Sequence, residues 1–217
     1  MMNNQEVISK KFAAMAVVLA LAVVWPFPTL ASEEEEAADA APLTEAELIA
    51  VLESDEAEWV EKQDACRRLS RIGTRASIPA LAALLTDDTL SHMARFALEP
   101  MDYPEVDEAL RQALTVAEGL PKTGIIISMG VRRDAEAVPL LIPLLQHDQP
   151  DTARAAAGAL GRIASPGATA ALLEYRESAP DAVRSAVNEG LLAAAQRYVD
   201  EDMNLSLIHI SEPTRPY

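Results

Sequence analysis

Apolar residues recur along the middle of the chain at the spacing of amphipathic helices. The clearest examples are two sets: Ile78, Leu81 and Leu85, and Val138, Leu141 and Leu145. Residues three or four positions apart lie on one face of an α-helix. A second, alanine-rich kind of helix precedes each such stretch, as in residues 154–160, RAAAGAL. The pattern predicts helices that alternate between these two kinds.

The same pattern repeats along the chain. A similar stretch begins at each of four apolar anchor positions, and a fifth partial unit follows: Leu69, Leu98, Met129, Leu160 and Leu191. The anchors follow one another at a nearly constant interval, which is slightly shorter between the first two than between the others. A period near 30 fits two helices and two short turns, and one such hairpin cannot bury its apolar face alone. The sequence therefore predicts an all-α superhelix, a solenoid of stacked helical hairpins over residues 44–204.

Local signals agree with helices. Thr44 and Glu47 have the spacing of a capping box at the start of the first helix. Pro79 and Pro139 fall in the first turn of a second helix, where a missing N–H costs little. The β-branched run 125–127 comes just before an anchor, so we expect it to lie in a first helix. Alanine on one helix lets leucine and isoleucine of the next approach closely, which accounts for the 4% aromatic content.

These units resemble the HEAT repeat, specifically the short type called PBS-lyase HEAT-like. The third unit matches the family pattern best, with Gly130, Asp134, Ala137-Val138-Pro139 and Leu141. The fourth keeps Ala159-Leu160-Gly161 and Pro166, and the first keeps Ile78-Pro79. The second departs most, with Glu99-Pro100 where the family has glycine. The resemblance covers about residues 57–198 and implies a scaffold or binding module.

The N-terminus has the features of an export signal. Lys10 and Lys11 precede the apolar run 12–24, prolines follow, and small residues allow cleavage after Ala31. Residues 1–31 are therefore predicted to be a signal peptide, with an uncleaved membrane anchor as the alternative. Residues 32–43 begin SEEEEAADAAP and are predicted to be an acidic, disordered linker. The chain is thus expected to be an exported bacterial protein of the periplasm or cell envelope.

The C-terminal residues 205–217, LSLIHISEPTRPY, closely resemble the translation of a sequencing adapter. On that interpretation the repeat domain of residues 44–204 is truncated, and the last segment carries no function. The alternative is a genuine frayed tail with a proline-rich end.

Charge and composition limit the partners. The chain carries a formal net charge of −16. Without the two terminal segments, residues 32–204 hold 32 acidic and 15 basic residues, which gives −17. Nucleic acid and anionic lipid require clustered lysine and arginine, so neither is expected as a partner. The only predicted contact with a membrane is the signal segment, if it is uncleaved.

Few residues have the arrangement that catalysis or metal binding requires. Cys66 is the only cysteine and is expected to be a small buried apolar residue. His92 and His147 lie in different repeats, without the spacing of a zinc site. The sequence predicts no catalytic residue, no cofactor, no metal and no enzyme.

Two features are candidate partner-binding surfaces. The first is the apolar run 138–145, in which Val138, Leu141, Ile142 and Leu145 are expected to form the core face. The remaining candidates point elsewhere, where the next hairpin covers them or a partner binds them: Leu140, Pro143 and Leu144. Pro143 is expected to bend its helix.

The second candidate surface is formed by arginines that follow the anchors, so that stacking places them along one edge: Arg71, Arg132, Arg133 and Arg162. They either pair with Asp134 and other loop acids or form a ridge for an anionic ligand. Arg132 and Arg133 are the candidate binding residues on this edge.

The expected function is a protein-interaction scaffold of the bacterial cell envelope, which binds partners on the concave face lined by second helices. The alternative is an N-terminal accessory module of a larger exported enzyme or redox protein, whose catalytic domain is missing beyond residue 204. The family name alone suggests a third possibility, a lyase acting on a bilin chromophore, which export and the scarcity of aromatics disfavour.

Overall fold

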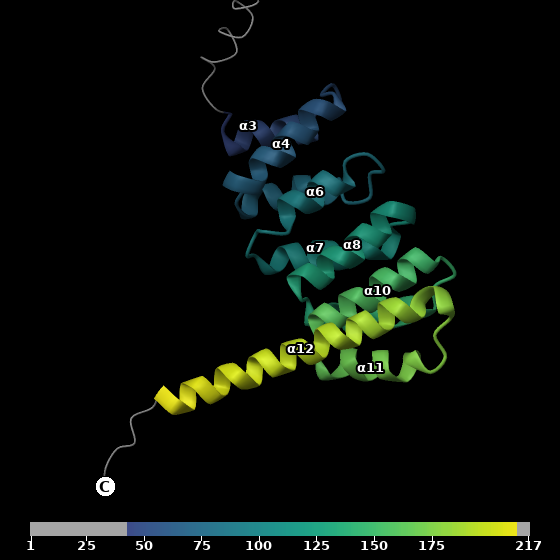
Figure 1. The fold of residues 1–217 in the computed structure, drawn as a ribbon. Helices are drawn as coiled ribbons and strands as arrows, with labels where there is room; N and C mark the ends of the chain where they lie inside the picture. Colours follow the sequence, from purple (N-terminus) through teal and green to yellow (C-terminus); the bar gives the residue numbers. More distant parts are fainter. Residues whose placement is uncertain (1–42, 212–217) are drawn as a thin grey trace, which may run out of the picture. The chain divides into compact units, whose positions relative to one another are not determined.

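The computed structural model describes residues 43–211, which form α-helices and short 3-10 helices and, within that range, no β-strand (Figure 1). The first helices of the hairpins are α4 (Trp59–Ile72), α6 (Ser91–Leu98), α8 (Gly119–Arg132), α10 (Pro150–Ile163) and α12 (Asp181–Ser211). The second helices are α3 (Glu45–Glu53), α5 (Ile78–Ala83), α7 (Pro104–Val116), α9 (Val138–Leu141) with the 3-10 helix η3 (Pro143–Gln146), and α11 (Pro166–Arg176). Two further 3-10 helices, η1 (Arg75–Ser77) and η2 (Ala135–Ala137), open α5 and α9.

The helices stack in two layers. Along one layer, α4 contacts α6, α6 contacts α8, α8 contacts α10, and α10 contacts α12. Along the other, α3 contacts α5, and α5 contacts α7. Between the layers, α10 contacts α11. Figure 1 shows the helices following one another in chain order through the stack. The predicted all-α solenoid of hairpins is therefore confirmed.

The predicted anchors form the core. Leu69, Leu98, Met129 and Leu160 are fully buried, and Leu191 in the last unit is half-buried. Burial of apolar surface stabilises the stack by about 25 cal/mol per Å². Alanines such as Ala94 and Ala156 are also fully buried, and they let neighbouring helices approach.

Two glycines lie where neighbouring first helices stack on each other. Gly130 and Gly161 lie inside α8 and α10 rather than in turns. A Cβ at Gly130 would lie 2.6 Å from Ala159 Cα, and one at Gly161 would lie 2.4 Å from Gly190 Cα. They are glycines because neighbouring first helices pack backbone against backbone, where no side chain fits.

Most of the local predictions are confirmed. The capping box is present, with Thr44 N–H donating to Glu47 at 2.8 Å. Residues 125–127 lie within α8. Pro143 interrupts its helix, so that α9 ends at Leu141 and a 3-10 helix follows. Ile142, predicted to be core, is 37% exposed, because it lies about 100° of helix beyond the buried Leu141, at the edge of the core face.

The terminal segments lie mostly beyond the described part of the chain. The predicted signal peptide of residues 1–31 and nearly all of the 32–43 linker fall outside it. Residues 205–211 continue α12, and the rest of the adapter-like segment is outside. These domain boundaries stay predictions. Between residues 43 and 211, no helix is both long and apolar enough to cross a bilayer.

Candidate partner-binding surfaces

The interruption at Pro143 leaves apolar side chains exposed on the second-helix layer. Leu140 is 39% exposed, Ile142 is 37% exposed, and Pro143 lies on the surface. We call these three residues the second-helix patch. Leu144, the remaining candidate, packs partly against the core. Stacking therefore covers Leu144 in part and leaves Leu140 and Pro143 accessible.

A small hollow adjoins this patch. Ile142 lines it together with Ala171, Glu174 and Tyr175 of α11, and its volume is about 180 Å³. Leu173 of α11 is 52% exposed and follows Ile142 by one repeat. The layer of second helices thus presents apolar residues at the same position in two successive units.

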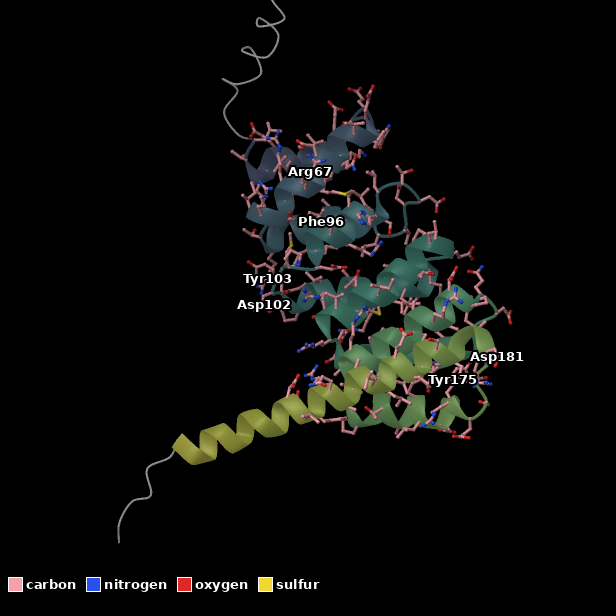
Figure 2. The ribbon with its side chains drawn as sticks, viewed as in Figure 1. Arg67, Phe96, Asp102, Tyr103, Tyr175 and Asp181 are labelled. Carbon is pink, nitrogen blue, oxygen red and sulfur yellow. The ribbon has the colours of Figure 1, made fainter. Side chains whose placement is uncertain are left out.

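Arg132 has a structural role. Its guanidinium donates from Nη1 to the carbonyl oxygens of Met101 at 2.7 Å and Glu99 at 3.0 Å, and from Nη2 to that of Tyr103 at 3.3 Å. Nε also donates to Asp107 Oδ1 at 2.5 Å, and the side chain is 9% exposed. Asp102 and Tyr103 lie together at this connection (Figure 2). Arg132 thus holds the turn of the preceding hairpin, the one that departs from the family pattern.

The other predicted edge arginines behave differently. Arg133 is exposed and ends α8 in the left-handed conformation, with φ of 57°. Asp134 is bound by Arg111 of α7, whose Nη1 lies 2.6 Å from Oδ2. Arg132 does pair with an acid, but that acid is Asp107 of helix α7 and not a loop residue, and Asp134 has a partner that sequence reasoning missed. Arg111 was missed because it comes from a second helix, far from the anchors.

The opposite layer carries a larger hollow that sequence reasoning also missed. The outward position of successive first helices is occupied by Phe96, Ile127 and Gly158, each one repeat after the last. Arg67 precedes them on α4, and Figure 2 shows it beside Phe96 on the neighbouring helix. The loss of side-chain volume at Gly158 opens a hollow of about 580 Å³ across α8, α10 and α12. Leu120 and Ile127 lie two helical turns apart on α8 and are both exposed. This pair of apolar residues was the signal in the sequence that could have indicated the hollow.

The residues considered for chemistry do not converge. Cys66 is fully buried, as predicted. His92 is exposed at the start of α6, and His147 Nδ1 accepts from the backbone N–H of Gln149 at 3.1 Å. No group of three histidine, cysteine or acidic residues with the geometry of a metal site occurs in the described chain.

Burial makes the one thiol unreactive. Desolvation raises the pKa of Cys66 to about 11, and only the thiolate attacks a disulfide reagent. At about pH 8, well below that value, we expect a chromogenic aromatic disulfide to leave Cys66 unlabelled in the folded protein and to label it in urea. Stoichiometric labelling of the native protein at the rate of a free cysteine would contradict this.

Comparison with known proteins gives a family for part of the chain. Residues 108–192 match the family described as HEAT repeats. The structure is similar to that of human deoxyhypusine hydroxylase in complex with glycerol, with a TM-score of 0.50 and 18% sequence identity. The match covers 70% of this chain and 74% of that one. At this identity the likeness shows the fold. No curated protein sequence matches the chain significantly.

One prediction is wrong as a consequence. The sequence predicted no enzyme, because no residues had the arrangement that catalysis requires and because the HEAT-like resemblance implied a scaffold. Deoxyhypusine hydroxylase has this fold and is an enzyme by its name. The physical reason is that catalytic groups depend on individual side chains placed on a fold, so a stack of helical hairpins is no ground for excluding a reaction.

Proposed function

Residues 108–192 of this chain are HEAT repeats, and we propose that the helical scaffold they belong to binds a protein partner in the bacterial cell envelope through the second-helix patch. The observation that carries this proposal is the exposure of Leu140, Ile142 and Pro143 on a helix that proline interrupts. Leu140 and Ile142 lie on either side of the helix with Pro143 between them, so a partner that covers the exposed side of this segment contacts all three.

Charge and sequence support the class of partner. A net charge of −16 opposes nucleic acid and anionic lipid. Export is supported by Lys10 and Lys11 with the apolar run that follows them. The small hollow beside Ile142 would receive one side chain of the partner, as an anchor residue in a pocket does.

The test is site-specific crosslinking in cells. A photo-activated amino acid replaces Gln146, which is exposed beside the patch, in the full chain with its N-terminal segment. We expect an adduct of defined mass in the envelope fraction. Leu140→Glu or Ile142→Glu is expected to reduce that adduct at least about tenfold, because a buried unpaired charge opposes the contact.

Leu120→Glu is the matched control, since Leu120 is 83% exposed on the other layer. It is expected to keep the adduct, and all three variants are expected to keep the thermal midpoint of the wild type. Equal adducts in the patch and control variants, no adduct at all, or an adduct with the mass of two copies of this chain would overturn the proposal.

A further inference from the structure

Acidic side chains are concentrated on the second helices. Together these helices carry more acidic than basic residues, whereas the first helices carry more basic than acidic ones. Two basic residues of the second-helix layer are paired within it. Arg75 Nε lies 3.1 Å from Glu105 Oε1, and Arg111 binds Asp134 and Glu136. The second-helix layer is therefore the more acidic side of the stack, and a partner bound there meets negative charge.

The small hollow beside Ile142 adjoins a second hollow. The second one lies at the turns that follow η3 and α11, has a volume of about 570 Å³ and is lined by residues of both turns. We call it the turn hollow. Three residues line both hollows: Gln146, Tyr175 and Ser178. A partner segment bound at the second-helix patch can therefore reach the small hollow and, next to it, the turn hollow.

The charged groups that line these hollows are carboxylates. Glu174 lines the small hollow, Asp148 lines the turn hollow, and both residues are exposed. No ion pair within the described part of the chain includes either of them. His147 adds no positive charge in this geometry, because its Nδ1 accepts the N–H of Gln149 and therefore carries no proton.

Apolar walls beside a carboxylate match the two parts of a lysine or arginine side chain. The methylene stem of such a side chain packs on apolar surface while its cationic end stays at the rim. In the small hollow, Ile142 offers the apolar wall and Glu174 the charge. In the turn hollow, Pro150 and Pro180 offer the wall and Asp148 the charge. A partner without cations would remove water from these carboxylates and give nothing in return, which costs free energy.

We propose that the partner of the second-helix patch presents a basic segment, whose lysine or arginine side chains enter the two hollows and pair with Glu174 and Asp148. This inference rests on the proposed function, since it gives the chemistry of the partner that the patch binds. The acidic second-helix layer attracts such a segment before contact, and the two carboxylates fix where its cations bind.

The experiment uses the photo-activated amino acid at Gln146 in the full chain, because Gln146 lines both hollows. The adduct formed in cells is digested, and the crosslinked partner peptide is sequenced by mass spectrometry. We expect lysine or arginine within a few residues of the crosslinked position. Glu174→Arg and Asp148→Arg are each expected to reduce the adduct at least about tenfold, because like charges then face each other. Glu174→Gln removes the attraction without adding repulsion, so it is expected to reduce the adduct less.

Glu177→Arg is the matched control. It makes the same change of charge at an exposed residue of the same segment that lines neither hollow. This variant is expected to keep most of the adduct, and all the variants are expected to keep the thermal midpoint of the wild type because the replaced side chains are exposed.

The outcomes separate this inference from the proposed function. An adduct that Leu140→Glu abolishes but that both Glu174→Arg and Asp148→Arg leave unchanged would overturn the basic segment and support the patch. A crosslinked peptide without basic residues, or an equal loss with Glu177→Arg, would also overturn the basic segment. No adduct at all, or an adduct that Leu140→Glu leaves unchanged, would overturn both.

Discussion

Gly161→Ala is expected to lower the free energy of unfolding by about 2–3 kcal/mol, the cost of overpacking a tight contact. The new Cβ would lie 2.4 Å from Gly190 Cα and 2.5 Å from its carbonyl oxygen. Both are backbone atoms, so α10 and α12 would have to separate. The denaturant midpoint in a urea titration measures the effect.

Gly158→Ala is the matched control on the same helix. A Cβ there meets no atom within 4 Å, so the higher helix propensity of alanine is expected to stabilise the protein by about 0.5–1 kcal/mol. The two identical substitutions, less than one helical turn apart in α10, are thus expected to have opposite signs. Shifts of the same sign and size would mean that backbone contact does not set the stacking distance.

Arg132→Ala is expected to lower the free energy of unfolding by about 3 kcal/mol, because it removes a nearly buried ion pair and leaves buried acceptors without donors. The carbonyl oxygen of Met101 would lose a hydrogen bond of 2.7 Å, and Asp107 would lose its cation. Arg132→Lys is expected to recover only part of the loss, since one ammonium cannot replace the guanidinium fork. Urea unfolding measures both.

Arg133→Ala is the control, because the side chain of this neighbouring arginine is exposed. The substitution leaves a non-glycine residue in the left-handed conformation. The free energy of unfolding of the Arg133→Ala variant is therefore expected to stay within about 0.5 kcal/mol of the wild type. An Arg132→Ala effect no larger than that of Arg133→Ala would show that the connection at residues 99–103 does not depend on the guanidinium.

The fold was predictable because the pattern of apolar residues repeats along the chain at a nearly constant interval. Leu69, Leu98, Met129 and Leu160 are spaced almost evenly and are all fully buried. The same positions on successive hairpins meet the same environment, so each repeat confirms the assignment of the others. Ile142 was misplaced because it lies at the edge of the apolar face, about 40° from Val138 and about 100° from Leu141, where the hydrophobic pattern does not decide burial.

The candidate surfaces were predictable only in part. Exposure of Leu140 and Pro143 follows from one apolar run in one helix. The hollow around Gly158 needs three helices to be placed side by side, and the partner of Asp134 comes from α7. Such contacts depend on the rotation of each helix about its axis. A hydrophobic pattern predicts that rotation only approximately. The tight pairing of Gly161 with Gly190 likewise appears only in three dimensions.

The equivalence of Gly130 and Gly161 also bears on how the length of such a protein can change. Each glycine meets the backbone of the next first helix, and residues 131–161 separate them by one full period. Excision of that segment in frame would join Gly130 to Arg162 and bring Gly130 to the place where Gly161 meets Gly190. The hairpins on either side would close on each other with a contact they already use, so the protein can be shortened or lengthened by whole units without a new core.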